Sequence, residues 1–247
     1  MAHTENLTVY KDKNEFAKPT KAISIIDLLR HTSGLGYNYG TNSYIDSLYK
    51  KIENINNNEE FVEKLFSIPL FSEPSTEWRY GFSADVLGRL IEEITGQSLY
   101  EFLSENIFKP LEMNDTHFQL PLNKTNRFIP VYAYDEQENL LKEMREWNYM
   151  RFMMKNRESG GGGLISTTSD YINFCSMLLN GGSFNGNQII SSNSIKKMTQ
   201  NQIGSLTYPW GEGIKFGYGF YVVTDSQKSD LSDSNGSFGW SGAADTH

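Results

Sequence analysis

Residues 78–96 read WRYGFSADVLGRLIEEITG, and the second half of this stretch predicts an amphipathic helix. Ser83 is placed to cap the start of the helix, and Gly96 to end it. The apolar stripe recurs at helical spacing, at Val86, Leu87, Leu90, Ile91 and Ile94. We therefore expect a helix between these two caps, with one buried face.

Four further stretches on either side of this one predict helices. Ser24 and Asp27 form a capping box ahead of an apolar run, which Gly34 is expected to end. The other stretches are bounded by serines, glycines or a proline, which commonly mark helix ends. The four expected ranges are 24–34, 98–109, 169–181 and 194–198.

Strand signals come late in the chain. Residues 216–223 are aromatic and β-branched, and residues 236–242 are glycine-rich but suit an edge strand. Helices up to about residue 200 followed by strands indicate an α+β fold rather than alternating β–α–β units. Because two strands do not form a stable sheet alone, we expect part of the sheet to be missing from this chain.

Three polar or glycine-rich stretches are expected to be irregular. Residues 57–60 and 226–235 are polar and predict surface loops. Residues 160–163 are consecutive glycines, but a phosphate-binding loop would continue with Gly-Lys-Ser/Thr, and this one continues with Leu-Ile-Ser. The glycine run therefore predicts a turn.

The composition excludes several classes of function. The 247 residues carry a net charge of −8, which argues against a nucleic-acid partner, and no apolar run is long enough for a membrane span. Cys175 is the only cysteine, so no internal disulfide is expected. The four histidines lack the spacing of metal ligands, and we expect neither a metal nor a cofactor. The polar N-terminus contains no signal peptide, which leaves the compartment open.

Three short patterns are candidates for a nucleophilic serine. Residues 47–50 and 194–197 follow Ser-x-x-Lys, which puts an amine beside a hydroxyl on one helix face. Both stretches are interpreted as solvated helix faces. Residues 239–243 approach Gly-x-Ser-x-Gly but end in alanine, and too few residues follow for the helix that this pattern requires. None of the three is assigned the role.

Five segments together carry a stronger pattern. They are ISIIDLLRHTSGL (23–35), WRYGFSADVLG (78–88), PLEMNDT (110–116), GGGLIST (161–167) and FGWSGAADT (238–246). In this order, over nearly the whole chain, they resemble the serine β-lactamase and penicillin-binding-protein superfamily, and within it the class C β-lactamase-like branch with its esterases and D-aminopeptidases. The resemblance implies a β-lactamase/transpeptidase-like α+β fold, with a helical subdomain beside part of an antiparallel sheet.

The chain departs from the family at two places. In the family a Ser-x-x-Lys nucleophile lies well upstream of His-Thr-Ser-Gly, and the 30 residues before His31 contain no such pattern. The chain also stops just inside the third active-site motif. We therefore expect an internal fragment of a longer hydrolase, inactive or nearly so by itself. Its expected parts are an N-terminal segment (1–20), a mostly helical subdomain (21–205) and truncated strands of the α/β subdomain (206–247).

The resemblance also implies the residues of a site. Tyr80 matches the family's catalytic tyrosine and would act as the base. An ordinary phenol has a pKa of about 10, so nearby ammonium groups are needed to favour the phenolate. Trp240, Ser241 and Gly242 take the place of Lys-Thr-Gly and would bind substrate. The backbone N–H of Ala243 would be an oxyanion donor. Because Trp240 carries no charge, an uncharged ester fits better than a β-lactam or a D-Ala terminus.

The leading hypothesis is a serine hydrolase that forms an acyl-enzyme with a small-molecule ester or amide, most simply a carboxylic ester. One alternative is a β-lactamase or a D-aminopeptidase or D-Ala-D-Ala carboxypeptidase-like enzyme. Another is a catalytically inactive scaffold or cell-wall-binding homologue, which would lack the upstream Ser-x-x-Lys. We also expect unpaired sheet edges to lower the stability or to promote self-association.

Overall fold

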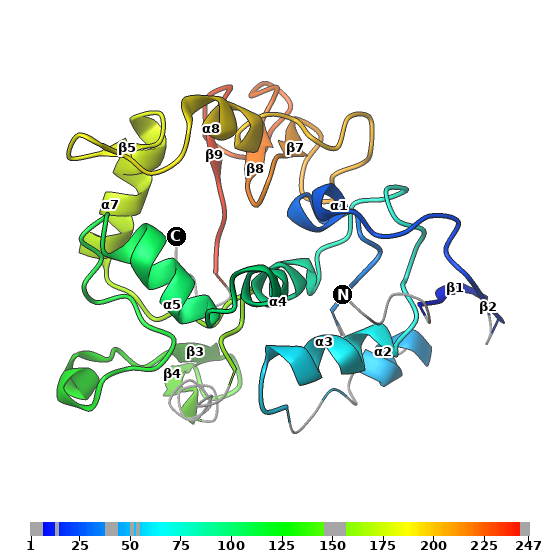
Figure 1. Cartoon of the computed structure of the whole chain (residues 1–247), viewed down its shortest axis with the longest axis horizontal. Helices are drawn as coiled ribbons and strands as arrows, with labels where there is room; N and C mark the ends of the chain where they lie inside the picture. The colour runs from blue at the N-terminus through cyan, green and yellow to red at the C-terminus, as the bar shows by residue number, and fades with distance from the viewer. Residues whose placement is uncertain are drawn as a thin grey trace.

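The computed structural model describes residues 7–12, 15–37, 44–49, 52, 55–145 and 157–242 (Figure 1). Its helices are α1 (Ile25–Leu29), α2 (Tyr44–Tyr49), α3 (Asn58–Phe66), α4 (Ser83–Thr95), α5 (Leu99–Leu103), the π-helix η2 (Ser104–Phe108), the 3-10 helix η3 (Leu122–Arg127), α7 (Thr168–Leu179) and α8 (Ser192–Met198). Its strands are β1 (Val9–Asp12), β2 (Glu15–Ala17), β3 (Tyr132–Asp135), β4 (Leu140–Glu143), β5 (Ser183–Phe184), β6 (Asn187–Gln188), β7 (Ile214–Phe216), β8 (Tyr221–Val223) and β9 (Phe238–Gly239).

Helix α4 is the central element. Figure 1 shows it between α3 on one side and α5 on the other, and α1 also packs against it. Val86 on its apolar face is almost completely buried, and Gly96 ends the helix in a left-handed conformation (φ 71°), as predicted. A Cβ atom at Gly88 would lie 2.9 Å from the Leu99 side chain, so this glycine allows α5 to approach closely.

The start of α4 differs from the prediction. Ser83 is the first helical residue rather than the cap, and no side chain caps this end. The Ser83 hydroxyl instead lies 2.8 Å from the hydroxyl of Ser33, and both side chains are completely buried. The serine therefore makes a tertiary contact, which a local pattern does not distinguish from a cap.

The other predicted helices are present with shifted ends. The capping box of Ser24 and Asp27 starts α1 as predicted, but α1 ends at Leu29, before Gly34, and His31 takes a left-handed conformation (φ 55°). The helix expected over 98–109 is α5 followed directly by the π-helix η2. Helices α7 and α8 lie close to their expected ranges.

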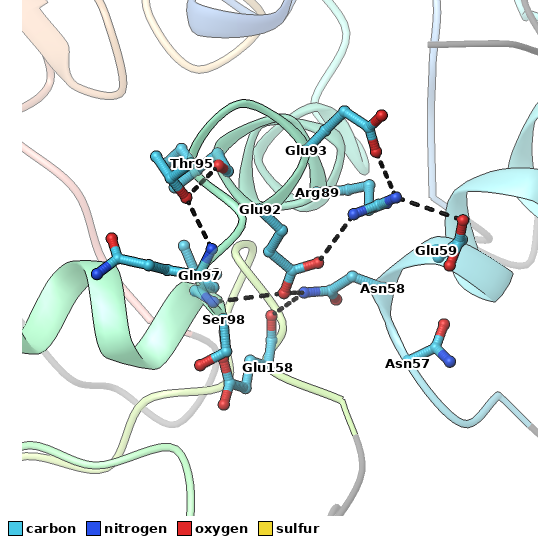
Figure 2. Close-up of polar contacts among 12 residues, drawn as sticks. Asn57, Asn58, Glu59, Arg89, Glu92, Glu93, Thr95, Gln97, Ser98 and Glu158 are labelled. Carbon is cyan, nitrogen blue, oxygen red and sulfur yellow. Dashed lines mark hydrogen bonds and ion pairs between the residues drawn. The ribbon is translucent and has the colours of Figure 1, made fainter.

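The prediction of a surface loop at residues 57–60 is wrong. Asn57 caps α3 by accepting a hydrogen bond from the backbone N–H of Glu60, and the next residue, Asn58, is buried. Figure 2 shows the Asn58 amide donating to Glu92 Oε1 (2.8 Å) and to the backbone carbonyl of Glu158 (2.9 Å). The polar run thus begins a helix and joins α3 to α4 and to the segment before the glycine run.

The strand expected over residues 216–223 is the end of β7, a turn and β8, which together form a hairpin. Ile214 in β7 pairs with Val223 in β8, and Gly219 (φ 83°) lies in the turn between them. Strand β9 pairs with the other side of β8, in agreement with the edge strand expected over 236–242. The result is an antiparallel sheet in the order β7–β8–β9.

Strands are not confined to the C-terminal part. Three hairpins, β1–β2, β3–β4 and β5–β6, lie before residue 200, and each strand is two to four residues long. Such short strands carry no alternation that a sequence pattern detects. In Figure 1 the β3–β4 hairpin lies at the opposite end of the view from the β7–β9 sheet.

The buried side chains form three clusters. The first lies among α1, α2, α3 and α4, and the second among η2, α7 and α8. The third is aromatic and joins the segment before α4 to the C-terminal sheet; its buried members are Trp78, Ile203, Tyr208, Ile214 and Phe216. Tyr80 and Trp240 pack against this third cluster, which therefore positions the candidate site.

Among the residues described, no helix is both long and apolar enough to cross a membrane. The subdomain boundaries near residues 20 and 205 stay a prediction.

Candidate active site

Tyr80 lies in the segment that leads into α4, and backbone hydrogen bonds hold this segment against the residues after α1. The N–H of Arg79 donates to the carbonyl of His31 (2.8 Å), and the N–H of Ser75 donates to the carbonyl of Thr32 (2.7 Å). Two of the five motif segments, far apart in the sequence, therefore lie side by side and fix the position of Tyr80.

Glycines allow these two segments to touch. A Cβ atom at Gly81 would lie 2.5 Å from the Cα atom of Gly36. One at Gly34 (φ 82°) would lie 2.2 Å from the carbonyl oxygen of Ser72. Both distances are far below van der Waals contact, so a side chain at either position would force the neighbouring backbone to shift, and Gly81 directly follows Tyr80.

A buried carboxylate supports the same region. Asp27 is 2% exposed and accepts hydrogen bonds from the hydroxyls of Ser24 (2.5 Å), Thr32 (2.9 Å) and Ser75. Arg30 also pairs with it at 3.1 Å. Burial alone would raise the pKa of Asp27, but the hydrogen bonds outweigh burial and hold this pKa well below its usual range. Asp27 is therefore an ionised structural anchor.

His31 packs directly on Tyr80. Its ring centroid lies 5.0 Å from that of Tyr80, 5.6 Å from Phe216 and 6.0 Å from Trp78. Burial lowers the pKa of His31 to about 4, so the imidazole is neutral at pH 7. Its Nδ1 atom is buried and makes no hydrogen bond within the described part of the chain. His31 thus supports the tyrosine by packing rather than by charge.

Tyr80 and Trp240 meet across the fold. Their ring centroids are 4.9 Å apart, and Trp240 also packs edge-on against Phe216 at 5.5 Å. Trp240 directly follows β9, so the pairing of β9 with β8 brings it to the tyrosine. The structure therefore brings together two of the residues that the sequence assigned to one site.

The other assigned residues are only partly placed. Ser241 and Gly242 follow Trp240 and are exposed, and Ala243 lies outside the described residues. Within the described ranges Tyr80 contacts the rings of His31, Trp78 and Trp240, none of which carries an ammonium group. The ammonium group that would favour the phenolate is therefore not among the contacts described.

Two aromatic residues of the site were missed by the sequence analysis. Tyr208 packs edge-on against Trp78 at 4.8 Å, and Trp210 lies 6.0 Å from Tyr80 and 5.4 Å from Trp240. Burial raises the pKa of the Tyr208 phenol well above its usual range, as do the neighbouring phenols of Tyr221 and Tyr80, so Tyr208 stays neutral. The Tyr-Pro-Trp triplet at residues 208–210 was the available signal, since aromatic residues in a polar loop call for an explanation.

The serines of the two Ser-x-x-Lys patterns each form a hydrogen bond with a residue three positions earlier in the chain. Ser47 is exposed on α2 and donates to the carbonyl of Tyr44 at 2.6 Å, while its partner Lys50 lies outside the described residues. Ser194 in α8 lies 2.9 Å from the hydroxyl of Ser191, the cap of that helix. These contacts fit the interpretation of both stretches as helix faces.

The Cys175 thiol and the metal-ligating side chains are the remaining candidates for catalytic chemistry. Burial raises the pKa of the Cys175 thiol, which keeps it protonated and weakly nucleophilic. In the ranges described, no three or more histidine, cysteine, aspartate or glutamate side chains are grouped as metal ligands.

Comparison with known proteins extends over most of the chain. The family model described as Beta-lactamase matches residues 5–247. An uncharacterized protein of Mycobacterium tuberculosis is 30% identical over 236 residues, which cover 92% of this chain and 58% of the relative. Lovastatin esterase of Penicillium rubens is 27% identical over 187 residues, with 75% of this chain and 46% of that protein covered.

A solved structure shows the same fold. It is EstCE1, described as a hydrolase with promiscuous acyltransferase activity, with a TM-score of 0.72, 24% identity and coverage of 89% of this chain and 61% of that one. The chain spans about half the length of the curated relatives it matches. These likenesses confirm the fold class that the sequence predicts.

Proposed function

The chain belongs to the β-lactamase family, and from this premise we propose that it forms part of a serine hydrolase that cleaves uncharged carboxylic esters through an acyl-enzyme. The observation that carries the proposal is the contact between Tyr80 and Trp240, with ring centroids 4.9 Å apart. A tyrosine suited to proton transfer lies beside an uncharged aromatic ring where the resemblance to β-lactamases would put a lysine.

Tyr80 is the proton carrier in this proposal. As the phenolate, it accepts the proton of the attacking serine hydroxyl while the serine oxygen bonds to the ester carbonyl carbon. It then gives this proton to the departing alcohol oxygen as the ester bond breaks. The packing of His31 on Tyr80, with ring centroids 5.0 Å apart, supports the role, because proton transfer requires a fixed donor–acceptor geometry.

Trp240 selects the substrate class. An indole has one N–H donor and no charge, so it provides no clamp for a substrate carboxylate. An apolar ring favours the burial of apolar substrate surface instead. Lovastatin esterase, among the relatives, bears a name consistent with an ester substrate. We assign Ser241 and Gly242 to substrate contact and the N–H of Ala243 to the oxyanion.

The nucleophilic serine is placed, in this proposal, in a Ser-x-x-Lys segment that is not among these 247 residues. Its lysine would supply the ammonium that favours the Tyr80 phenolate. The catalytic centre is then completed by residues of the longer protein.

Labelling with a fluorophosphonate, read by intact mass, tests the proposal. We expect no adduct on the 247-residue chain and one adduct on a longer form that includes the Ser-x-x-Lys segment. A stoichiometric adduct on the 247-residue chain would overturn the placement of the nucleophile, and mapping would begin at Ser47. No adduct on the longer form would favour the inactive scaffold, whereas labelling by a fluorescent penicillin would favour a β-lactamase or carboxypeptidase-like enzyme.

A further inference from the structure

Trp210 is the outermost ring of the aromatic cluster around Tyr80. It is 52% exposed, whereas Trp78 and Tyr208, the rings behind it, are 7% and 6% exposed. Its centroid lies 5.2 Å from Trp78 and 5.4 Å from Trp240. A large ring that is half in solvent and continuous with a candidate site differs from a single exposed apolar residue, which needs no explanation.

The loop that carries Trp210 is fixed on both sides. Before it, Tyr208 is buried in the cluster, and the carbonyl of Leu206 accepts a hydrogen bond from Lys215 Nζ at 2.8 Å. After it, Gly211 packs so closely on Ile214 that a Cβ atom would lie 2.8 Å from the isoleucine side chain. The exposed ring is therefore held in place before a ligand arrives, which lowers the entropy lost on binding.

The arrangement of the rings decides which ligand fits. A cage for a cation needs aromatic faces arranged around an open centre. Here Trp210 makes edge contacts with Trp78 (74°) and Tyr80 (69°), so the rings occupy the space between them. Beyond these contacts the indole is still half exposed, which suits a flat apolar group stacked on it.

We propose that Trp210 determines specificity by stacking on a flat apolar group of the substrate, next to the ester bond at which Tyr80 transfers the proton. The preferred substrates are then esters with an aromatic or similarly planar ring. The nature of the reacting bond rests on the proposed function. The stacking surface does not, because it follows from the exposure and packing of Trp210.

Binding tests the surface without catalysis. Calorimetric titration with 2-naphthol compares the unaltered 247-residue chain with Trp210→Ala, Trp210→Phe and Tyr132→Ala. Tyr132 is a matched control because it is 53% exposed and lies on the separate β3–β4 hairpin. We expect Trp210→Ala to weaken binding about tenfold and Trp210→Phe less than about threefold, since one stacked ring is worth about that much. Tyr132→Ala is expected to bind as the unaltered chain does.

Three outcomes would overturn the inference. They are no binding by the unaltered chain at millimolar 2-naphthol, equal binding by Trp210→Ala, and an equal loss in Tyr132→Ala. In the form that hydrolyses esters, Trp210→Ala should lower the ratio of kcat/KM for 2-naphthyl acetate over ethyl acetate about tenfold, and an unchanged ratio contradicts the inference. Trp210-dependent binding without any fluorophosphonate adduct on the longer form would support the surface and overturn the proposed function.

Discussion

The hydroxyls of Ser33 and Ser83 lie 2.8 Å apart, and neither side chain is exposed to solvent. This bond joins the segment after α1 to the first residue of α4, three positions after Tyr80 in the chain. It is a fully buried polar contact, and an unpaired hydroxyl is costly in a buried position. The bond therefore couples the stability of the fold to the position of the candidate base.

Ser83→Ala should lower the free energy of unfolding by about 1–3 kcal/mol, because it leaves the buried Ser33 hydroxyl with only the Leu35 N–H, at 3.3 Å, as a partner. Urea denaturation measures this change. The control is Ser47→Ala, whose hydroxyl is exposed and bonds within its own helix, and its effect should stay within about 0.5 kcal/mol. The double variant Ser33→Ala with Ser83→Ala should cost less than the sum of the two single changes. Strict additivity would show that the two hydroxyls do not depend on each other.

Asn58 supports a second prediction. Its amide donates to Glu92 and to the carbonyl of Glu158 (Figure 2), and the residue is 3% exposed. Asn58→Asp should destabilise the fold more than Asn58→Ala, because a carboxylate offers neither acceptor a proton and adds a charge beside Glu92. We expect about 2 kcal/mol for alanine and more for aspartate at pH 7.

Thermal unfolding of the two variants tests this order. Asn106→Ala is the control, since that side chain is exposed and bonds to a backbone carbonyl of its own helical turn. If Asn58→Asp were as stable as the unaltered chain, the buried amide would not be what joins α3 to α4.

The sequence predicts elements whose boundaries are set locally. The Ser24 capping box and the left-handed Gly96 were recognised because each acts on the nearest turn of its helix. The predicted roles of Ser83 and Asn58 are wrong because the partners that decide their roles, Ser33 and Glu92, lie far away in the sequence. A polar residue looks the same in a sequence whether it caps a helix, lies in a loop or bonds inside the core.

The residues of the candidate site also differ in whether a local sequence pattern identifies them. The motifs were sufficient to assign Tyr80 and Trp240 to one site, and the structure places their rings together. Trp210 belongs to no motif, and its place beside them follows from the packing of a loop on the third cluster. Sequence reasoning therefore assigned Tyr80 and Trp240 to one site but not Trp210, the exposed ring beside them.

His31 gives the fold a predictable response to acid. Burial lowers the pKa of His31 from 6.5 to about 4, so the unfolded chain binds more protons than the folded chain between these values. The contribution of His31 to the free energy of unfolding is thus fully present above about pH 6.5 and falls as the pH drops towards 4. The loss at the lower limit is about 3 kcal/mol.

Urea unfolding between pH 7 and pH 4 measures that slope. His31→Asn removes the titrating ring, and asparagine tolerates the left-handed backbone at this position. Its stability should depend less on pH over this range than that of the unaltered chain. His117→Gln is the comparison, because burial also lowers the pKa of His117, but this residue contacts Tyr100 and Lys124 instead of Tyr80. Equal slopes in His31→Asn and the unaltered chain would mean that His31 is not held neutral.

Tyr80→Phe separates the chemical role of the phenol from its packing. The ring contacts with His31 and Trp240 persist in phenylalanine, so the thermal unfolding midpoint should change little. Loss of the proton carrier should slow fluorophosphonate labelling and ester hydrolysis by about 10²–10⁴-fold in the form of the protein that shows these activities. Tyr100→Phe is the control, since this tyrosine lies on α5 and bonds to His117 instead. A labelling rate for Tyr80→Phe within about threefold of the unaltered protein would remove Tyr80 from the reaction, because a group that carries the proton in the transition state cannot be lost at so small a cost in rate.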